Sequence, residues 1–135
     1  MTKIEVQYEG DLHCRAVHGP TGTTLMTDAP PDNQGKGESF SPTDLVGTAM
    51  GTCMLTIMGI YARRKGIDMN GSRVEVLKEM VADPARRIGR LTATFTLPAQ
   101  LTTIQRAALE NAARGCPVHH SLHPDVQVDL IFRYA

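Results

Sequence analysis

The stretch SPTDLVGTAMGTCMLTIMGIYARRKG, residues 41–66, decides how this chain folds. Ser41 is a favoured helix N-cap, Pro42 suits the first helical position, and Asp44 stands where a capping box places an acid. Apolar and small residues then continue to a basic last turn, where cations suit the helix dipole, and Gly66 is a typical helix stop. We therefore predict one helix of about 24 residues, roughly 36 Å long.

The two glycines Gly47 and Gly51 share one face of this helix. A glycine inside a helix costs about 1 kcal/mol relative to alanine, so we expect another helix to pack closely against that face. Simple tolerance of glycine is the alternative. Because the helix is apolar on nearly all sides and too long for one small core, we expect it to be buried inside an oligomer.

Three short strands are predicted before this helix. Ile4, Val6 and Tyr8 alternate with polar residues, which is the pattern of a half-buried strand. Turn signals at residues 10–11 and 19–22 separate it from two further alternating segments, and together these predict an antiparallel meander. A loop rich in Pro and Gly then leads to the helix.

Two strands, a second helix and a last strand are predicted after Gly66. Thr102 is the expected N-cap of the second helix, with Gln105 as its capping-box partner, and Pro117 is expected to end it. The predicted order β-β-β-α-β-β-α-β is an α+β fold in a single domain, residues 1–135. One strand is expected to bury Leu91, Ala93, Phe95 and Leu97, and the second helix Ile104, Ala108, Ala112 and Cys116.

Composition limits the classes of function. Fourteen basic and fourteen acidic residues give a net charge of zero, so no global field attracts nucleic acid or an anionic membrane. We see no signal-peptide core and expect no window near the roughly 20 apolar residues of a membrane helix. A cytoplasmic location is therefore expected, where three cysteines act as buried filler, metal ligands or redox groups.

Cys53 and Cys116 are the candidate reactive residues, one on each predicted helix. A single cysteine facing an apolar environment is most often an inert, buried side chain. Two cysteines on the two helices that pack together indicate a pair. A nucleophilic thiolate needs a nearby cation or hydrogen-bond donor, and His119, Arg114 and Arg15 are the candidates.

Two motifs of this chain resemble those of the OsmC/Ohr family, whose members include organic hydroperoxide resistance proteins. Residues 41–53, SPTDLVGTAMGTC, resemble the motif that ends at the family's first cysteine, and residues 116–119, CPVH, resemble its second cysteine motif. The predicted element order matches as well, so the resemblance spans nearly the whole chain.

The resemblance implies an OsmC-like fold, in which two central helices pack against antiparallel sheets in an intertwined homodimer. It implies reduction of organic hydroperoxides, with Cys53 as the peroxidatic thiolate and Cys116 as the resolving thiol. An external dithiol, for example of the lipoyl type, would then reduce the disulfide. Met50, Met54 and Ile57 would form an apolar lining that favours organic peroxides.

One position departs from the family pattern. Peroxidase members have a Glu ten residues before the first cysteine, paired with an Arg that activates the thiolate, whereas this chain has Thr43 there and Asp44 next to it. Arg15 is the candidate for the activating Arg. The alternative function is therefore a non-peroxidase dimer of the same fold that binds an apolar small molecule or serves another thiol-redox role.

We expect neither a metal nor a cofactor. Cys116, His119, His120 and His123 form C-x2-H-H-x2-H, a spacing that permits zinc but lacks a CxxC or HExxH motif. Cys14 belongs to no motif and is expected to be structural.

Overall fold

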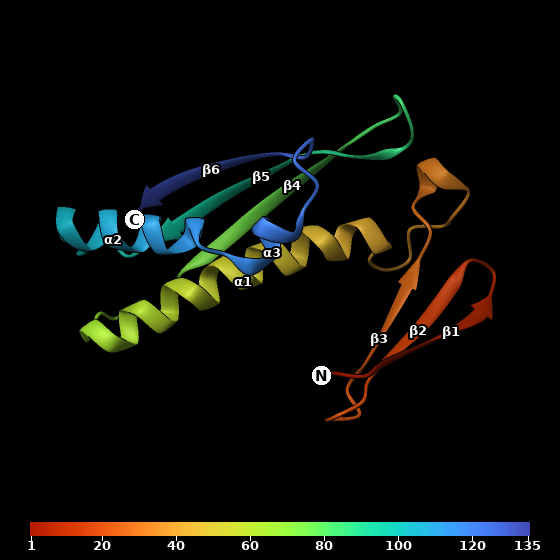
Figure 1. Ribbon diagram of the computed structural model, residues 1–135, viewed down its shortest axis with the longest axis horizontal. Helices are drawn as coiled ribbons and strands as arrows, with labels where there is room; N and C mark the ends of the chain where they lie inside the picture. Colours follow the sequence, from red (N-terminus) through yellow and green to blue (C-terminus); the bar gives the residue numbers. More distant parts are fainter. The chain divides into compact units, whose positions relative to one another are not determined.

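The computed structural model describes all 135 residues. Its element order confirms the predicted β-β-β-α-β-β-α-β fold and adds a short 3₁₀ turn and a short third helix. The chain divides into two compact units, Met1–Val46 and Gly47–Ala135, which are described one at a time. The elements are β1 Ile4–Gly10, β2 His13–His18, β3 Thr24–Asp28, η1 Pro31–Asn33, α1 Pro42–Lys65, β4 Arg73–Val81, β5 Arg87–Leu97, α2 Thr103–Arg114, α3 Pro117–Ser121 and β6 Gln127–Tyr134 (Figure 1).

The first unit contains the predicted antiparallel meander, in the strand order β1-β2-β3. Gly10, at the end of β1, has φ of 87°, a left-handed conformation that glycine adopts without strain. The predicted half-burial of β1 is wrong for this chain, because Ile4, Val6 and Tyr8 are 63–65% exposed. One face of the meander therefore presents apolar side chains to solvent.

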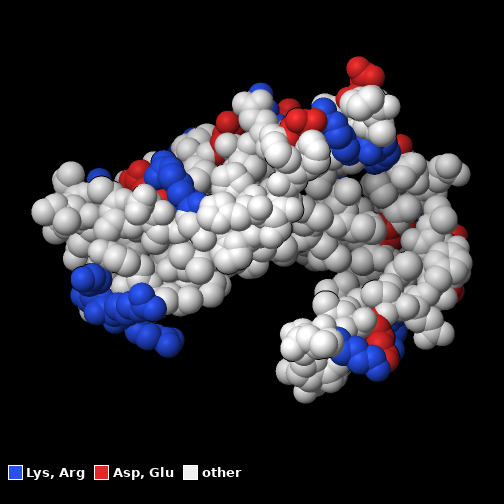
Figure 2. Space-filling model, viewed as in Figure 1, with Lys and Arg blue, Asp and Glu red and all other residues white.

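Helix α1 begins as predicted. The Ser41 backbone N–H donates to Asp44 Oδ2 at 2.9 Å, and the Asp44 N–H donates to Ser41 Oγ at 3.1 Å. This reciprocal pair is the capping box, and the helix runs for the expected 24 residues. Its basic last turn, Arg63 to Lys65, forms the cluster of Lys and Arg at the free end of the helix (Figure 2).

The second unit contains a sheet in the order β4-β5-β6. Strands β4 and β5 are antiparallel, but β5 and β6 are parallel, contrary to the expectation of antiparallel sheets. The reason is the connection: α2 and α3 carry the chain back to the starting end of β5 before β6 begins, and a parallel pair requires such a crossover.

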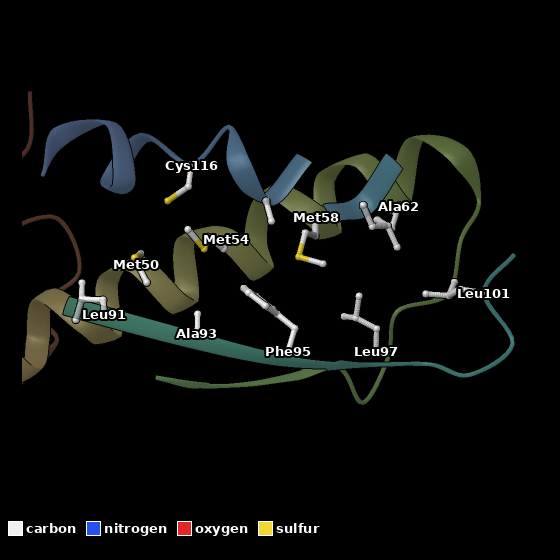
Figure 3. Close-up of a cluster of buried hydrophobic side chains, with 12 residues drawn as sticks. Met50, Met54, Met58, Ala62, Leu91, Ala93, Phe95, Leu97, Leu101 and Cys116 are labelled. Atoms are coloured by element: carbon white, nitrogen blue, oxygen red, sulfur yellow. The ribbon is translucent and has the colours of Figure 1, made fainter. Parts of the chain in front are cut away.

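The core of the second unit lies between α1, α2 and one face of this sheet (Figure 3). The predicted inward face of β5 is confirmed, since Leu91, Ala93, Phe95 and Leu97 are at most 1% exposed. The predicted stripe of α2 is only partly right: Cys116 is buried and Ala112 packs against the core, but Ile104 is 83% exposed and the helix also buries Leu109 and Ala113. From α1 the core receives, at a spacing of four residues, Met50, Met54, Met58 and Ala62.

The glycine face of α1 packs on a strand, so the expected helix partner is wrong. A Cβ on Gly51 would lie 3.0 Å from Val76 and 3.2 Å from Val74, both on β4. A Cβ on Gly47 would lie 3.4 Å from Val76. The glycines therefore allow close approach of α1 to the sheet.

Helix α1 is long and apolar enough to cross a membrane, with a mean hydropathy of 1.6 over 18 residues, so the expectation that no window has this character is wrong. The core helix of a soluble protein passes the same test. The methionines that α1 buries in the core account for part of this composition, since 33% of the window is buried.

Candidate functional site

The first cysteine of the candidate pair, Cys53, lies in the middle of α1. It is partly buried and packs against the core of the second unit. Its neighbour along the helix, Met54, is completely buried. Cys53 therefore sits at the margin of the core, where its sulfur is neither fully enclosed nor freely exposed.

Cys116 occupies a different position from the one predicted. Helix α2 ends at Arg114 with Gly115 as its cap, and Cys116 is the N-cap of α3, for which Pro117 is the first residue. The Cys116 sulfur accepts a hydrogen bond from the backbone N–H of His119 at 3.4 Å. Gly115 is the C-cap of α2, and its N–H bonds to the carbonyls of Ala112 and Ala113 in the last turn. The helix therefore ends before Pro117.

The two cysteines meet in the reduced state. All three cysteines of the chain are free, and the Cys53 thiol lies close enough to Cys116 to act on its pKa. Burial raises the pKa of the Cys116 thiol, and the neighbouring Cys53 raises this pKa further, whereas the backbone N–H of His119 opposes the rise. The Cys116 thiol is therefore held in its protonated form beside Cys53.

The core methionine Met50 lies three residues before Cys53 on α1. Figure 3 shows the Cys116 side chain pointing from the α2–α3 connection toward α1, on the side where Met50 and Met54 are drawn. Both methionines are 0% exposed, so in this chain they fill the core and do not line an open cleft.

Two basic residues near Cys116 in sequence have different surroundings. The guanidinium of Arg114 lies 5.6 Å from the centre of the Phe132 ring, a cation–π contact with β6. His119 is half-buried, and its ring atom Nδ1 is enclosed without a hydrogen-bond partner. Of the two, His119 has a polar atom left to engage a bound molecule.

The remaining predicted residues belong to the first unit. Arg15 is an exposed residue of β2 that pairs with Gln7 and Met26 on the neighbouring strands. The Thr43 hydroxyl lies 3.2 Å from Ser41 Oγ, and Asp44 belongs to the capping box. That Arg15, Thr43 and Asp44 act on Cys53 stays a prediction, because these three residues belong to the first unit and Cys53 belongs to the second.

The last histidine after Cys116, His123, has a carboxylate partner of its own. His123 Nδ1 lies 3.7 Å from Asp125 Oδ2 on the surface, and this His123 side chain is 71% exposed. Cys14 is half-buried on β2 and pairs with Tyr8 and Thr27, as a structural residue would.

Sequence reasoning missed one cluster in the first unit, formed by His13, Asp28 and Glu38. The register of the meander places His13 opposite Asp28, so a register assignment for β2 and β3 would have found their contact.

Comparison with known proteins agrees with this geometry. Residues 35–131 match the family described as OsmC-like protein. A crystal structure from Psychrobacter arcticus 273-4, described as an osmotic stress induced and detoxification response protein, is similar to this chain with 45% identity and a TM-score of 0.92 over 98% of this chain and 96% of that one. No curated protein matches the sequence.

More distant structures share the fold. An organic hydroperoxide resistance protein OsmC from Legionella pneumophila is 17% identical with a TM-score of 0.77, over 98% of this chain and 96% of that one. OhrB of Bacillus subtilis, an organic hydroperoxide resistance protein, is 18% identical with a TM-score of 0.72, over 98% of both chains. The family match and the 45% identical relative together show that this chain belongs to the OsmC-like protein family.

Proposed function

We propose that this protein reduces organic hydroperoxides through Cys53 and Cys116, as a cytoplasmic enzyme. The observation that carries the proposal is the closeness of two free thiols on separate elements, Cys53 on α1 and Cys116 at the start of α3. A peroxidatic thiolate needs a resolving thiol within reach, and Cys116 is placed to serve as that thiol for Cys53.

The proposed cycle has three steps. The Cys53 thiolate attacks the distal peroxide oxygen, the O–O bond breaks, and the alkoxide takes up a proton and leaves as the alcohol. Cys53 is then a sulfenic acid, and the Cys116 sulfur displaces its hydroxyl as water to form a disulfide. An external dithiol reduces this disulfide by exchange and is itself oxidised.

Other residues have supporting roles in this proposal. By the family resemblance, Arg15 is the candidate for the Arg that activates Cys53, and Thr43 and Asp44 are the candidates for the position of its acidic partner. The backbone N–H of His119 orients the Cys116 sulfur, a role that its 3.4 Å hydrogen bond supports. Met50, which is completely buried, supports the helix turn before Cys53 from within the core.

The active form in this proposal is a homodimer. Apolar residues of β1 are 63–65% exposed, and Ile60 on α1 is 45% exposed. Contiguous exposed apolar surface on a small soluble chain usually marks an interface. A second copy of the chain is the occupant that the family resemblance implies.

Turnover of cumene hydroperoxide with a dithiol reductant tests the activity. Wild type is expected to consume the peroxide, and Cys53→Ser is expected to abolish consumption because the nucleophile is gone. Cys116→Ser should retain the first oxidation but lose turnover. Cys14→Ser is the matched control and should behave as wild type, since Cys14 lies in the sheet of the first unit. An inactive wild type would end the peroxidase proposal.

A second candidate function rests on Thr43. Its hydroxyl lies 3.2 Å from the Ser41 hydroxyl, where a peroxidase member of the family would carry a carboxylate. In this alternative the protein is a dimer that binds an apolar small molecule, and stoichiometric hydroperoxide leaves both thiols intact. Rapid loss of both thiols would exclude it.

A further inference from the structure

Three side chains with metal-binding atoms converge in the first unit, apart in sequence from Cys53 and Cys116. His13 starts β2, Asp28 ends β3, and Glu38 lies in the loop before α1. The His13 Nε2 atom lies 3.6 Å from Asp28 Oδ2 and 4.0 Å from Glu38 Oε1. All three ligand atoms lie within 4.8 Å of one another.

The His13 ring is oriented as a metal ligand would be. Its Nδ1 lies 2.6 Å from the carbonyl oxygen of Asp11. A carbonyl oxygen only accepts, so Nδ1 carries the hydrogen, and in the neutral ring Nε2 is left with a lone pair. Histidine ligands usually hold their second nitrogen in this way. In the neutral ring the Nε2 lone pair therefore faces the carboxylates of Asp28 and Glu38.

The Asp28 carboxylate supplies an independent sign of a missing partner. Its side chain is completely buried, and Oδ2 accepts one hydrogen bond from the backbone N–H of Glu38 at 3.0 Å. Its other oxygen, Oδ1, is also buried and has no hydrogen-bond partner. An unpaired carboxylate oxygen is costly to bury, and a cation bound by both oxygens of Asp28 and by His13 would offset that cost.

The donor set selects the class of cation. One imidazole and two carboxylates suit zinc and similar divalent transition metals. Ligand atoms about 2.0–2.1 Å from a tetrahedral zinc stand about 3.3–3.5 Å apart. The distances from His13 Nε2 to the oxygens of Asp28 and Glu38 are a few tenths of an ångström longer. Lys36 is the one ammonium beside the cluster, 3.9 Å from Glu38 Oε1, but it binds Asp11 more closely, at 3.0 Å.

We propose that His13, Asp28 and Glu38 bind a divalent transition cation, such as zinc, and thereby fasten the loop before α1 to the meander. The loop already bonds to the sheet through Ser39 Oγ, which donates to the Met26 carbonyl at 2.8 Å, and the Asp28 N–H, which donates to the Phe40 carbonyl at 3.1 Å. The cation would add a link between side chains of both strands and the loop.

Binding of Zn²⁺ and Co²⁺ to the intact reduced protein tests the proposal. We expect one Zn²⁺ per chain in competition with a chromophoric chelator, and a Co²⁺ spectrum without thiolate charge-transfer bands. His13→Ala removes a direct ligand and should weaken Zn²⁺ binding by at least about tenfold. Mutation of a residue that only hydrogen-bonds to a metal ligand already lowers metal affinity by about that factor. Glu38→Gln, at a position 57% exposed on the side chain, should weaken it while the fold is kept.

His123→Ala is the matched control, because it removes an exposed histidine beside a carboxylate and should leave affinity unchanged. Thiolate bands with Co²⁺, affinity unchanged in both His13→Ala and Glu38→Gln, or no binding by wild type would each overturn the proposal. The last result would leave His13 and Asp28 as a protonated ion pair without metal.

Discussion

At the residue scale, the decisive feature is the burial of the Cys116 thiol. This burial, in the α2–α3 connection, is the largest cause of its raised pKa. The two cysteines differ by position and not by residue type, because Cys116 is buried and Cys53 only partly buried. The sequence predicted the pair but placed Cys116 at the end of a helix, since a proline next to it suggested a helix stop.

The raised pKa of Cys116 predicts how stability depends on pH. The folded value lies above the ordinary value of 9.0, so the unfolded chain loses this proton first as pH rises. The contribution of Cys116 to the free energy of unfolding should therefore be fully present below pH 9.0 and should be lost as pH rises above that value. Cys116→Ser removes this part of the decline because serine does not titrate in that range.

Urea unfolding of the reduced protein at several pH values measures this effect. The phenol of Tyr134, whose pKa is also raised above its ordinary value of 10.0 by burial and by Glu110, contributes a decline of the same sign at higher pH, which the serine variant keeps. If the free energy of unfolding falls in parallel for wild type and Cys116→Ser between pH 9 and 10, the assignment of this decline to Cys116 is contradicted.

At the element scale, the glycine face of α1 controls how the helix meets β4. Gly51→Ala gains about 1 kcal/mol of helix propensity, but its methyl group would lie 3.0 Å from the stiff side chain of Val76. Overpacking of this kind costs about 1–3 kcal/mol. Gly59→Ala meets no atom within 4 Å and keeps the whole gain.

Chemical denaturation of the two alanine variants should therefore separate them. We expect Gly59→Ala to be more stable than wild type and Gly51→Ala to be equal to wild type or less stable. If Gly51→Ala gains as much as Gly59→Ala, the close contact between α1 and β4 is absent in solution.

Local sequence signals predicted the helices and strands better than they predicted how these elements pair and pack. Both capping boxes and the inward face of β5 could be predicted, because they depend on residues a few positions apart. The parallel pairing of β6 could not, since it depends on where the crossover returns the chain. The stripe through Ile104 failed because α2 is turned to bury Leu109 and Ala113.

At the scale of the whole molecule, the exposed face of β1 predicts a dimer. Val6→Lys places a charge in the middle of that face, where Val6 is 65% exposed. Sedimentation should find wild type at twice the chain mass of 14.7 kDa and the variant shifted toward the monomer. Gln7→Lys, on the opposite face of the same strand, is the control and should remain dimeric.

A wild type that sediments as a monomer would contradict the dimer and leave the apolar face of β1 unexplained. The sequence predicted an oligomer from the length of α1, and the exposed residues of β1 add an independent reason. The cluster of His13, Asp28 and Glu38 was missed because its members are far apart in sequence and meet only through strand register.

The most direct test of the cysteine-pair proposal is to treat the reduced protein with one equivalent of cumene hydroperoxide and map its cysteines by mass spectrometry. We predict the loss of two thiols and a disulfide between Cys53 and Cys116, with Cys14 still reduced. In Cys116→Ser, Cys53 should stop at a sulfenic acid that dimedone traps. Intact thiols in wild type, or oxidation centred on Cys14, would contradict the account.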